Sequence, residues 1–276
     1  MKISVTIITF NEAANIREAI ESVQWADEIL IVDSESTDNT RDIAEAFGAK
    51  VIVKKWEGFS LQKQFAADKA KFDWILSLDA DERVSEKLKA EILKLKELPE
   101  ENLADGYKLP RLSWYMNRWI RGGGWYPDSQ LRFYNRKRGV WKKVLIHESV
   151  EMKQDARVEF LNADLLHFSI PNASYHHRQI GERYAPLAAR QMFERGRRTS
   201  PLKIATAGLT TFLQTFLLKG GFRDGLAGFC IARFAGHHAF LKHLLLWEIQ
   251  NESNIRNSQS APENKNNDSR IQTSRL

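Results

Sequence analysis

The chain has 276 residues with a net charge of +6, and its 43% hydrophobic and 28% charged residues are typical of a globular protein with a sizeable core. Its single cysteine, Cys230, excludes an internal disulfide framework and a cysteine-based zinc site, so we expect a reducing compartment. Asn11 and Glu12 follow the N-terminal apolar run too soon for a signal peptide, which predicts a cytoplasmic protein.

Up to Pro99, apolar runs typical of strands alternate with segments that have helical spacing. Strands are expected at residues 3–10, 28–33, 51–53 and 74–79. Helices are expected after each of these strands, around residues 16–23, 43–47, 61–72 and 88–95. This alternation predicts an α/β fold in which a mainly parallel sheet lies between helices.

Polar side chains gather where three of these four strands end, at Thr9–Glu12, Asp33–Ser36 and Asp79–Glu82. A lone Asp-x-Asp is more often a solvated turn or a helix N-cap. The carboxyl ends of parallel strands meet at one edge of a sheet, however, and ligands bind there. The convergence favours a site for a divalent metal, Mg²⁺ or Mn²⁺, which takes carboxylate oxygens together with substrate phosphates. Glycine-rich loops of the dehydrogenase and P-loop types are missing, so we expect a nucleotide diphosphate to be held through the metal.

An aromatic-rich segment follows a short strand expected at residues 106–110. The rings surrounding the glycine run 122–124 are Trp114, Tyr115, Trp119, Trp125 and Tyr126. They either pack against the sheet, or they line a sugar site beneath a glycine loop that can close. The sequence supports both interpretations equally.

Five motifs in the first 170 residues resemble a known family. Ile-Ile-Thr-Phe-Asn-Glu (7–12), Ile-Val-Asp-Ser-Glu-Ser-Thr-Asp (31–38) and Leu-Asp-Ala-Asp-Glu-Arg (78–83) resemble the family 2 glycosyltransferases, which are inverting enzymes with the GT-A fold. Tyr-Pro-Asp-Ser-Gln-Leu-Arg (126–132) and His-Glu (147–148) are similar to the subgroup that adds glucose to the inner core of bacterial lipopolysaccharide. The resemblance implies a Rossmann-like GT-A sheet with a C-terminal helical attachment.

The resemblance also implies a role for each matching position. Thr9 and Asn11 line the nucleotide pocket, and Asp33 binds the base or the ribose. Asp79 contacts ribose or sugar. Asp81 coordinates the divalent metal that bridges the donor diphosphate.

Other side chains are expected to help hold the donor. Glu12 and Lys63 are predicted donor-binding residues, while Arg132 and Arg136 are candidate clamps for the donor diphosphate or an acceptor phosphate. One position departs from the family pattern. Ser34 stands where many members carry a second aspartate, which leaves the identity of the base open.

An inverting transfer needs a general base that removes the proton of the acceptor hydroxyl. Asp128 and Glu148 are the two candidate catalytic residues, and each has a structural alternative, as a turn residue or as an ion-pair partner. We favour Asp128 slightly, because the glycine run and the aromatic residues would bring it to the acceptor. His147, next to Glu148, is a candidate metal ligand.

The last third of the chain is basic and is expected to be helical, with breaks near residues 200–201 and 220–221. Its uncharged run at 204–218 is shorter than the roughly 20 residues that span a bilayer. The positive charge and the long apolar faces favour helices at an anionic membrane surface over a packed helical subdomain. We therefore expect a catalytic domain at 1–171, with a nucleotide-sugar half to about 100 and an acceptor half from 101, a basic helical region at 172–250 and a disordered tail at 251–276.

The sequence thus predicts a metal-dependent transferase that moves a hexose from a nucleotide-sugar donor, UDP-glucose, to a lipid-linked saccharide acceptor, the heptose of the lipopolysaccharide inner core. It is expected on the cytoplasmic face of the inner membrane.

A sugar nucleotidyltransferase is an alternative, but it usually has a glycine-rich loop after the first strand. A non-catalytic membrane-associated saccharide-binding protein is a second alternative, which predicts loss of the metal-binding acids. Nucleic-acid binding is not expected, because the basic residues accompany apolar runs.

Overall fold

A computed structural model describes residues 1–142 and 148–260. The chain divides into two compact units. The first holds residues 1–176 and 213–232, and the second holds residues 177–212 and the described residues from 233 onward.

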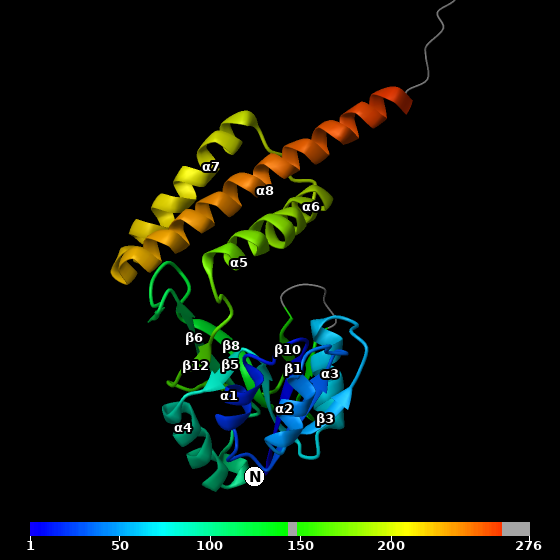
Figure 1. Cartoon of the computed structure of the whole chain (residues 1–276), viewed down its shortest axis with the longest axis vertical. Coiled ribbons are helices and arrows are strands. Elements are labelled where there is room, and N and C mark those ends of the chain that lie inside the picture. Colours follow the sequence, from blue (N-terminus) through cyan, green and yellow to red (C-terminus); the bar gives the residue numbers. More distant parts are fainter. Residues whose placement is uncertain (143–147, 261–276) are drawn as a thin grey trace, which may run out of the picture. The chain divides into compact units, whose positions relative to one another are not determined.

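The first unit is built on a mixed sheet with the strand order β3-β2-β1-β4-β8-β6-β12-β5 (Figure 1). The strands of its first half run parallel, as the alternating sequence predicts: β1 (Ile3–Thr9), β2 (Glu28–Asp33), β3 (Lys50–Val53) and β4 (Trp74–Asp79). The other half of the sheet contains β5 (Glu82–Val84), β6 (Gly106–Tyr115), β8 (Asp128–Asn135) and β12 (Leu165–His167). Strand β8 is antiparallel to both of its neighbours, β4 and β6, so the sheet is parallel on one side and mixed on the other. Short strands complete the unit: β7 (Arg118–Trp119), β9 (Gly139–Trp141), β10 (Val150–Met152) and β11 (Val158–Phe160).

Four helices cover the parallel half, and they follow the expected strands: α1 (Ile16–Glu21), α2 (Thr40–Ala46), α3 (Phe59–Lys69) and α4 (Glu86–Glu97). A short 3-10 turn, η1 (Glu100–Asn102), comes after α4. Two local signals in the sequence are confirmed. The Ser85 hydroxyl caps α4 by accepting a hydrogen bond from the Leu88 N–H at 3.2 Å. Gly48, which follows the C-cap of α2, has a φ of +82°, a value that favours glycine.

The core lies on both faces of the sheet because β1 and β4 are covered from both sides. Side chains of α1, α2 and α4 pack on one face together with Ile3, Val5 and Ile7. On the other face, α3 packs against Ile8 and Ile75 through its alanines. Burial on both faces fixes the ends of these strands, and the site lies at their carboxyl ends.

The C-terminal part is helical, as expected: α5 (Ala173–Arg178), η2 (Gln179–Tyr184), α6 (Ala185–Glu194), α7 (Pro201–Leu213), η3 (Gln214–Leu218), η4 (Gly221–Asp224) and α8 (Gly225–Ser260). Gly220, with a φ of +68°, forms the expected break between η3 and η4. Helix α8 continues to Ser260, past the point where we expect the tail to begin, and residues 261–276 lie outside the described chain. Within the described residues, no helix has both the length and the apolar character required to cross a membrane.

The second unit contains a close helix–helix contact between α7 and α8. A Cβ built on Gly236 would lie 2.7 Å from the carbonyl oxygen of Gly208, so the two glycines allow the helix backbones to approach closely. Thr199, before α7, hydrogen-bonds to His243 at 3.0 Å and to Gln250 at 3.1 Å. These contacts join the start of α7 to the later turns of α8.

Candidate active site

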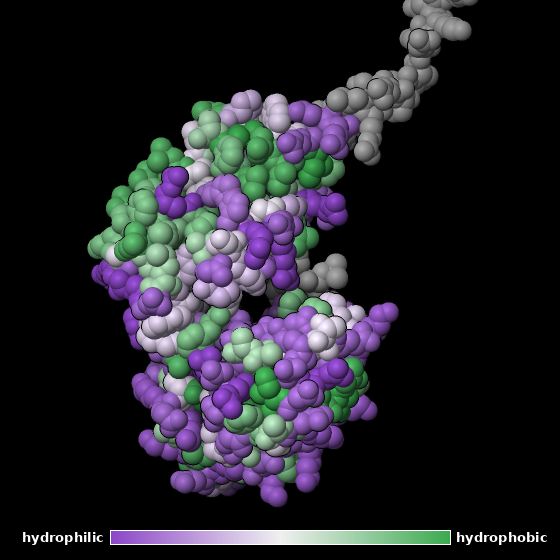
Figure 2. Space-filling model, viewed as in Figure 1, coloured by the Kyte–Doolittle hydropathy of each residue, from purple (hydrophilic) through white to green (hydrophobic). Residues whose placement is uncertain are grey.

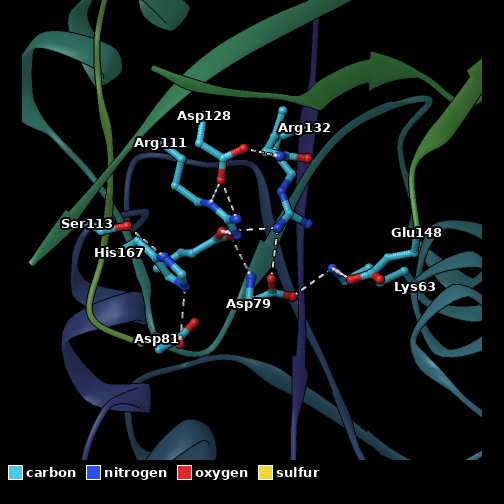
Figure 3. Close-up of polar contacts among 11 residues, drawn as sticks. Lys63, Asp79, Asp81, Arg111, Ser113, Asp128, Arg132, Glu148 and His167 are labelled. Atoms are coloured by element: carbon cyan, nitrogen blue, oxygen red, sulfur yellow. Dashed lines mark hydrogen bonds and ion pairs between the residues drawn. The ribbon is translucent and has the colours of Figure 1, made fainter. Parts of the chain in front are cut away.

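Asp79, the last residue of β4, is held between two cationic side chains (Figure 3). Its Oδ1 lies 2.8 Å from Nζ of Lys63 on α3, and its Oδ2 lies 2.8 Å from the Arg132 guanidinium on β8. Both cations are almost fully buried. Desolvation alone would raise the pKa of Asp79, but the charges of Arg132 and Lys63 hold that pKa well below its usual range. Asp79 is therefore a fixed carboxylate.

A second carboxylate, Glu82, connects this pair to the neighbouring strands. Glu82 is completely buried, and its Oε2 accepts the backbone N–H of Asp79 at 2.9 Å. Its Oε1 accepts hydrogen bonds from Arg132 at 3.0 Å and from Arg111, on β6, at 3.2 Å. The resulting network ties β4, β8 and β6 together at the edge where the sequence predicts the site.

Asp128, the first residue of β8, extends the network toward an open pocket. Its Oδ2 accepts a hydrogen bond from Nε of Arg111 at 2.9 Å, and its Oδ1 accepts one from Gln130 at 2.6 Å. The side chain is 37% exposed. It borders a pocket of about 340 Å³, whose lining also includes Arg111, Ser113, Gly124, Trp125 and His167. Asp128 is the carboxylate of this pocket.

Glu148 lies on the other side of Asp79, where its Oε1 is 3.3 Å from Nζ of Lys63. The Lys63 ammonium also lies 5.0 Å from the ring centroid of Trp141. Lys63 therefore bridges two predicted site residues, Asp79 and Glu148, and Glu148 is less exposed than Asp128. The neighbouring candidate metal ligand, His147, lies outside the described residues.

Asp81 has surroundings different from those of Asp79. Its Oδ2 lies 3.4 Å from Nε2 of His167, the last residue of β12, and Nδ1 of His167 lies 3.4 Å from the Ser113 hydroxyl. Across the described part of the chain, no lysine or arginine pairs with Asp81 (Figure 3). A carboxylate and an imidazole side by side are a donor set that divalent metals accept.

The residues present fit a metal that shares its coordination with a substrate. Within the ranges 1–142 and 148–260, no group of three or more His, Cys, Asp or Glu side chains forms a self-sufficient metal site. Asp81 and His167 would supply two ligands, and diphosphate oxygens would supply others, as is common for Mg²⁺. The charges also fit, because three cationic side chains face five carboxylates: Lys63, Arg111 and Arg132 against Asp79, Asp81, Glu82, Asp128 and Glu148.

Glu12, in the turn that follows β1, is affected by the negative charge of these carboxylates. Burial raises its pKa, a hydrogen bond from Asn15 opposes the rise, and the charges of Asp81 and nearby carboxylates add to it. A bound divalent cation would reduce this repulsion.

The ends of β1 and β2 form a separate hydrogen-bonded corner. The Thr9 hydroxyl donates to Oδ2 of Asp33 at 2.9 Å, and the Ser36 N–H donates to Oδ1 at 2.9 Å, so this buried carboxylate is satisfied by the end of β1 and by its own turn. Asn11 has a φ of +54°, and its side-chain oxygen accepts the Thr37 N–H at 2.8 Å. These contacts fix the shape of the turn at which we expect the nucleotide.

The glycine run 122–124 is anchored by hydrogen bonds, which favours the packing interpretation over that of a loop that can close. The Gly122 N–H donates to Asp224 at 2.6 Å, and the Gly123 N–H donates to the carbonyl of Lys219 at 2.9 Å. The partners come from the turn before α8, about a hundred residues further along the chain, which local sequence patterns cannot place. The nearby rings pack on one another, with the Tyr115 and Trp125 centroids 5.7 Å apart.

Arg136 does not act as a clamp at this site. Its guanidinium donates to the carbonyls of Ala67 and Ala70, at 2.9 and 2.7 Å, and contacts Asp73 at 3.1 Å. These partners lie at the end of α3 and the start of β4, so Arg136 joins these two elements and has a structural role. The prediction that it binds phosphate is wrong for this arrangement.

The sequence analysis does not identify two site residues, Arg111 and His167, and it includes Glu82 among the polar strand ends without giving it a role. Glu82 directly follows the Asp-x-Asp, so its position gave a signal. Arg111 lies just beyond the expected strand at 106–110, and His167 ends a three-residue strand that has little pattern of its own. The pairing of β12 with β6 brings His167 close to Ser113, and its pairing with β5 brings it close to Asp81.

The chain is similar to several known proteins. A model of the family described as "Glycosyl transferase family 2" matches residues 4–151. An uncharacterized glycosyltransferase of Rickettsia bellii is 35% identical, over 92% of this chain and 88% of the relative. The lipopolysaccharide core biosynthesis glycosyltransferase LpsC of Rhizobium meliloti is 29% identical, over 87% of this chain and 90% of LpsC. Among solved structures, S. aureus TarS 1-349 in complex with UDP-GlcNAc is similar with a TM-score of 0.46 and 15% identity, over 93% of this chain and 92% of that one.

Proposed function

The chain belongs to glycosyl transferase family 2, and we propose that it is a metal-dependent inverting hexosyltransferase. The proposed donor is UDP-glucose, and the proposed acceptor is a lipid-linked saccharide, the heptose of the lipopolysaccharide inner core. The relative LpsC, whose name places it in lipopolysaccharide core biosynthesis, supports this class of acceptor. The resemblance of the motif at 126–132 to the subgroup that adds glucose supports glucose as the transferred sugar.

The observation that carries the proposal is the contrast between the two aspartates of the Asp-x-Asp. Asp79 is neutralised by Lys63 and Arg132, whereas the ion-pair partner of Asp81 among the described residues is the imidazole of His167. Asp81 and His167 would therefore hold the divalent metal and, through it, the donor diphosphate. The metal would neutralise the charge that develops on the leaving phosphates.

The remaining donor-site residues receive roles that follow from their contacts. Arg132 contacts two carboxylates, so we assign it the positioning of Asp79 instead of a direct clamp on the diphosphate. Lys63, on the other side of Asp79, likewise positions this carboxylate. Asp79, held in this way, would accept hydrogen bonds from hydroxyl groups of the ribose or the sugar.

The corner at the ends of β1 and β2 would form the nucleotide end of the donor site. Thr9 and Asp33 shape it through their mutual hydrogen bond, and Asn11 holds the facing turn. Glu12 lies close enough to the Asp-x-Asp carboxylates to be affected by their charge, which supports a role for it on the diphosphate side of this corner.

Asp128 is the proposed general base. It borders the 340 Å³ pocket, is partly exposed, and has one oxygen oriented by Arg111 and the other by Gln130. An acceptor hydroxyl in this pocket could approach it directly, as a general base requires. Glu148 is the alternative base, but its carboxylate is bound to the buried Lys63.

The lipid-linked acceptor requires the protein to work at a membrane. We propose that residues 1–171 form the catalytic part, and that the basic helical region at 172–250 binds the anionic cytoplasmic face of the inner membrane. The excess of basic residues in this region, together with its apolar runs, supports this assignment.

The experiment that tests this function measures nucleoside diphosphate release from a panel of nucleotide-sugars, with and without Mn²⁺ or Mg²⁺. We expect UDP-glucose to be the best donor and the release to require metal. Asp81→Asn should lose this activity, whereas the matched control Asp155→Asn, at an exposed position far along the chain, should keep it. Release that is undiminished by a chelator would contradict the metal's role, and failure of every donor would contradict the transferase assignment.

A further inference from the structure

The turn that joins η3 to α8 exposes an unusual number of large apolar side chains. We name residues 217–226 the apical turn. Leu218 is 84% exposed and Leu226 is 68% exposed, and both Leu217 and Phe222 are about half exposed. Figure 2 shows hydrophobic surface along the helices that lead into and out of this turn. Contiguous exposed apolar side chains of this kind mark an interaction surface.

The charges on the apical turn indicate what that surface contacts. Lys219 and Arg223 are exposed, and neither forms an ion pair with a residue in the described ranges. The single acid of the turn, Asp224, is 4% exposed. Its carboxylate accepts hydrogen bonds from the backbone N–H groups of Arg121 and Gly122, at 3.2 and 2.6 Å, so it is already bound within the protein. The turn therefore presents apolar and cationic groups outward, the combination that binds anionic lipid surfaces.

The apical turn is also fastened to the loop that borders the pocket of Asp128. Besides the hydrogen bonds that the glycine run donates to Asp224 and Lys219, the Arg118 guanidinium donates to the carbonyl of Asp224 at 2.8 Å. The approach is close, because a Cβ built on Gly122 would lie 2.3 Å from the carbonyl oxygen of Gly220. Gly124 and Trp125, which follow in the same loop, line the pocket. A lipid surface at the turn would thus lie beside the pocket.

We propose that the apical turn is a lipid-docking element for an anionic leaflet. Leu217, Leu218, Phe222 and Leu226 enter the boundary between headgroups and acyl chains, and Lys219 and Arg223 contact the lipid phosphates. Through the glycine run, the same turn positions the pocket so that the sugar of a lipid-linked acceptor can enter it. The lipid binding rests on the proposed membrane role of residues 172–250, and the positioning step rests also on the proposed transferase activity.

The test measures binding of the purified full-length protein to vesicles of phosphatidylcholine with and without phosphatidylglycerol, by co-sedimentation at low and high salt. Leu218→Asp and Phe222→Asp should each weaken binding to the anionic vesicles by roughly tenfold or more, since burial of one large apolar side chain is worth a factor of that order. Added salt should weaken the binding of the wild type. The matched control is Leu202→Asp, because Leu202 is 73% exposed but lies at the start of α7, outside the turn. It should bind like the wild type.

Thermal unfolding and donor hydrolysis, measured on the same samples, separate the possible failures. Both variants of the turn should unfold at the wild-type temperature and should hydrolyse the donor in solution at the wild-type rate, because their side chains are exposed. Equal loss of vesicle binding in Leu202→Asp, or unchanged binding in Leu218→Asp and Phe222→Asp, would overturn the docking element. If the wild type hydrolyses no donor while the turn variants lose vesicle binding, the proposed transferase activity fails and the docking element stands.

Discussion

Removal of Arg132 should destabilise the protein strongly, because its guanidinium lies between two carboxylates. Arg132 is 5% exposed, and it lies 2.8 Å from Asp79 and 3.0 Å from the fully buried Glu82. In Arg132→Met the volume is roughly kept, but both carboxylates lose their shared cation. Removal of one partner from a buried ion pair costs about 3–5 kcal/mol. At about 2–4 °C per kcal/mol, the midpoint of thermal unfolding should fall by roughly 6–20 °C.

The assay is thermal unfolding followed by circular dichroism at neutral pH, with Lys137→Met as the matched control. Lys137 also pairs with an aspartate, Asp73, but its side chain is 72% exposed, so its removal should change the midpoint little. A loss in Arg132→Met no larger than that of the control would refute the view that Asp79 is a carboxylate fixed by buried charge.

The ion pair between Asp79 and Arg132 also predicts how the difference in stability between the wild type and Arg132→Met depends on pH. The pKa of Asp79 in the folded state is lowered, so its ion pairs stabilise the fold above the pKa of about 4 that applies in the unfolded chain. This contribution is lost as the pH falls below that value. The gap in stability between the wild type and Arg132→Met should therefore be widest near neutral pH and should narrow below about pH 4. A gap that widens on acidification would contradict the assignment.

Two further comparisons test the choice of general base and the packing of the turn before α8. Asp128→Asn should lower turnover by about two orders of magnitude or more, as loss of a general base does, while Glu148→Gln should have a smaller effect; the reverse order in a transfer assay would make Glu148 the base. Gly228→Ala should lower the unfolding midpoint, because its Cβ would lie 1.8 Å from the carbonyl oxygen of Gly221, whereas Gly181→Ala, with nothing within 4 Å, should not. Equal midpoints for the two alanine variants would mean that the turn before α8 is not tightly packed.

The half of the fold that depends on local patterns could be predicted from the sequence. Apart from β5, the strands and helices up to Pro99 follow from apolar spacing and from local signals such as Ser85 and Gly48, and the parallel order follows from the alternation. The polar strand ends, Asp79 above all, could be identified because parallel strands end at the same edge of a sheet.

What depends on long-range pairing could not be predicted. The strand expected at 106–110 continues through Pro110 to Tyr115. On one side, this strand pairs with β11 before Pro110 and with β12 after it. Because Pro110 lies in the gap between these two pairings, its missing N–H removes no ladder hydrogen bond on that side. This extension brings Arg111 to Glu82 and Asp128. The anchoring of the glycine run by Asp224 likewise joins segments that no local pattern connects.

The central claim is that Asp81, together with His167, holds the metal and the donor diphosphate. Calorimetric titration of UDP into the protein, with and without Mn²⁺, tests it most directly, since it needs no acceptor. Mn²⁺ should tighten UDP binding to the wild type, and this enhancement should disappear in Asp81→Asn and weaken in His167→Ala, while the metal-free affinity changes little. Full Mn²⁺ enhancement of UDP binding in Asp81→Asn would contradict the account.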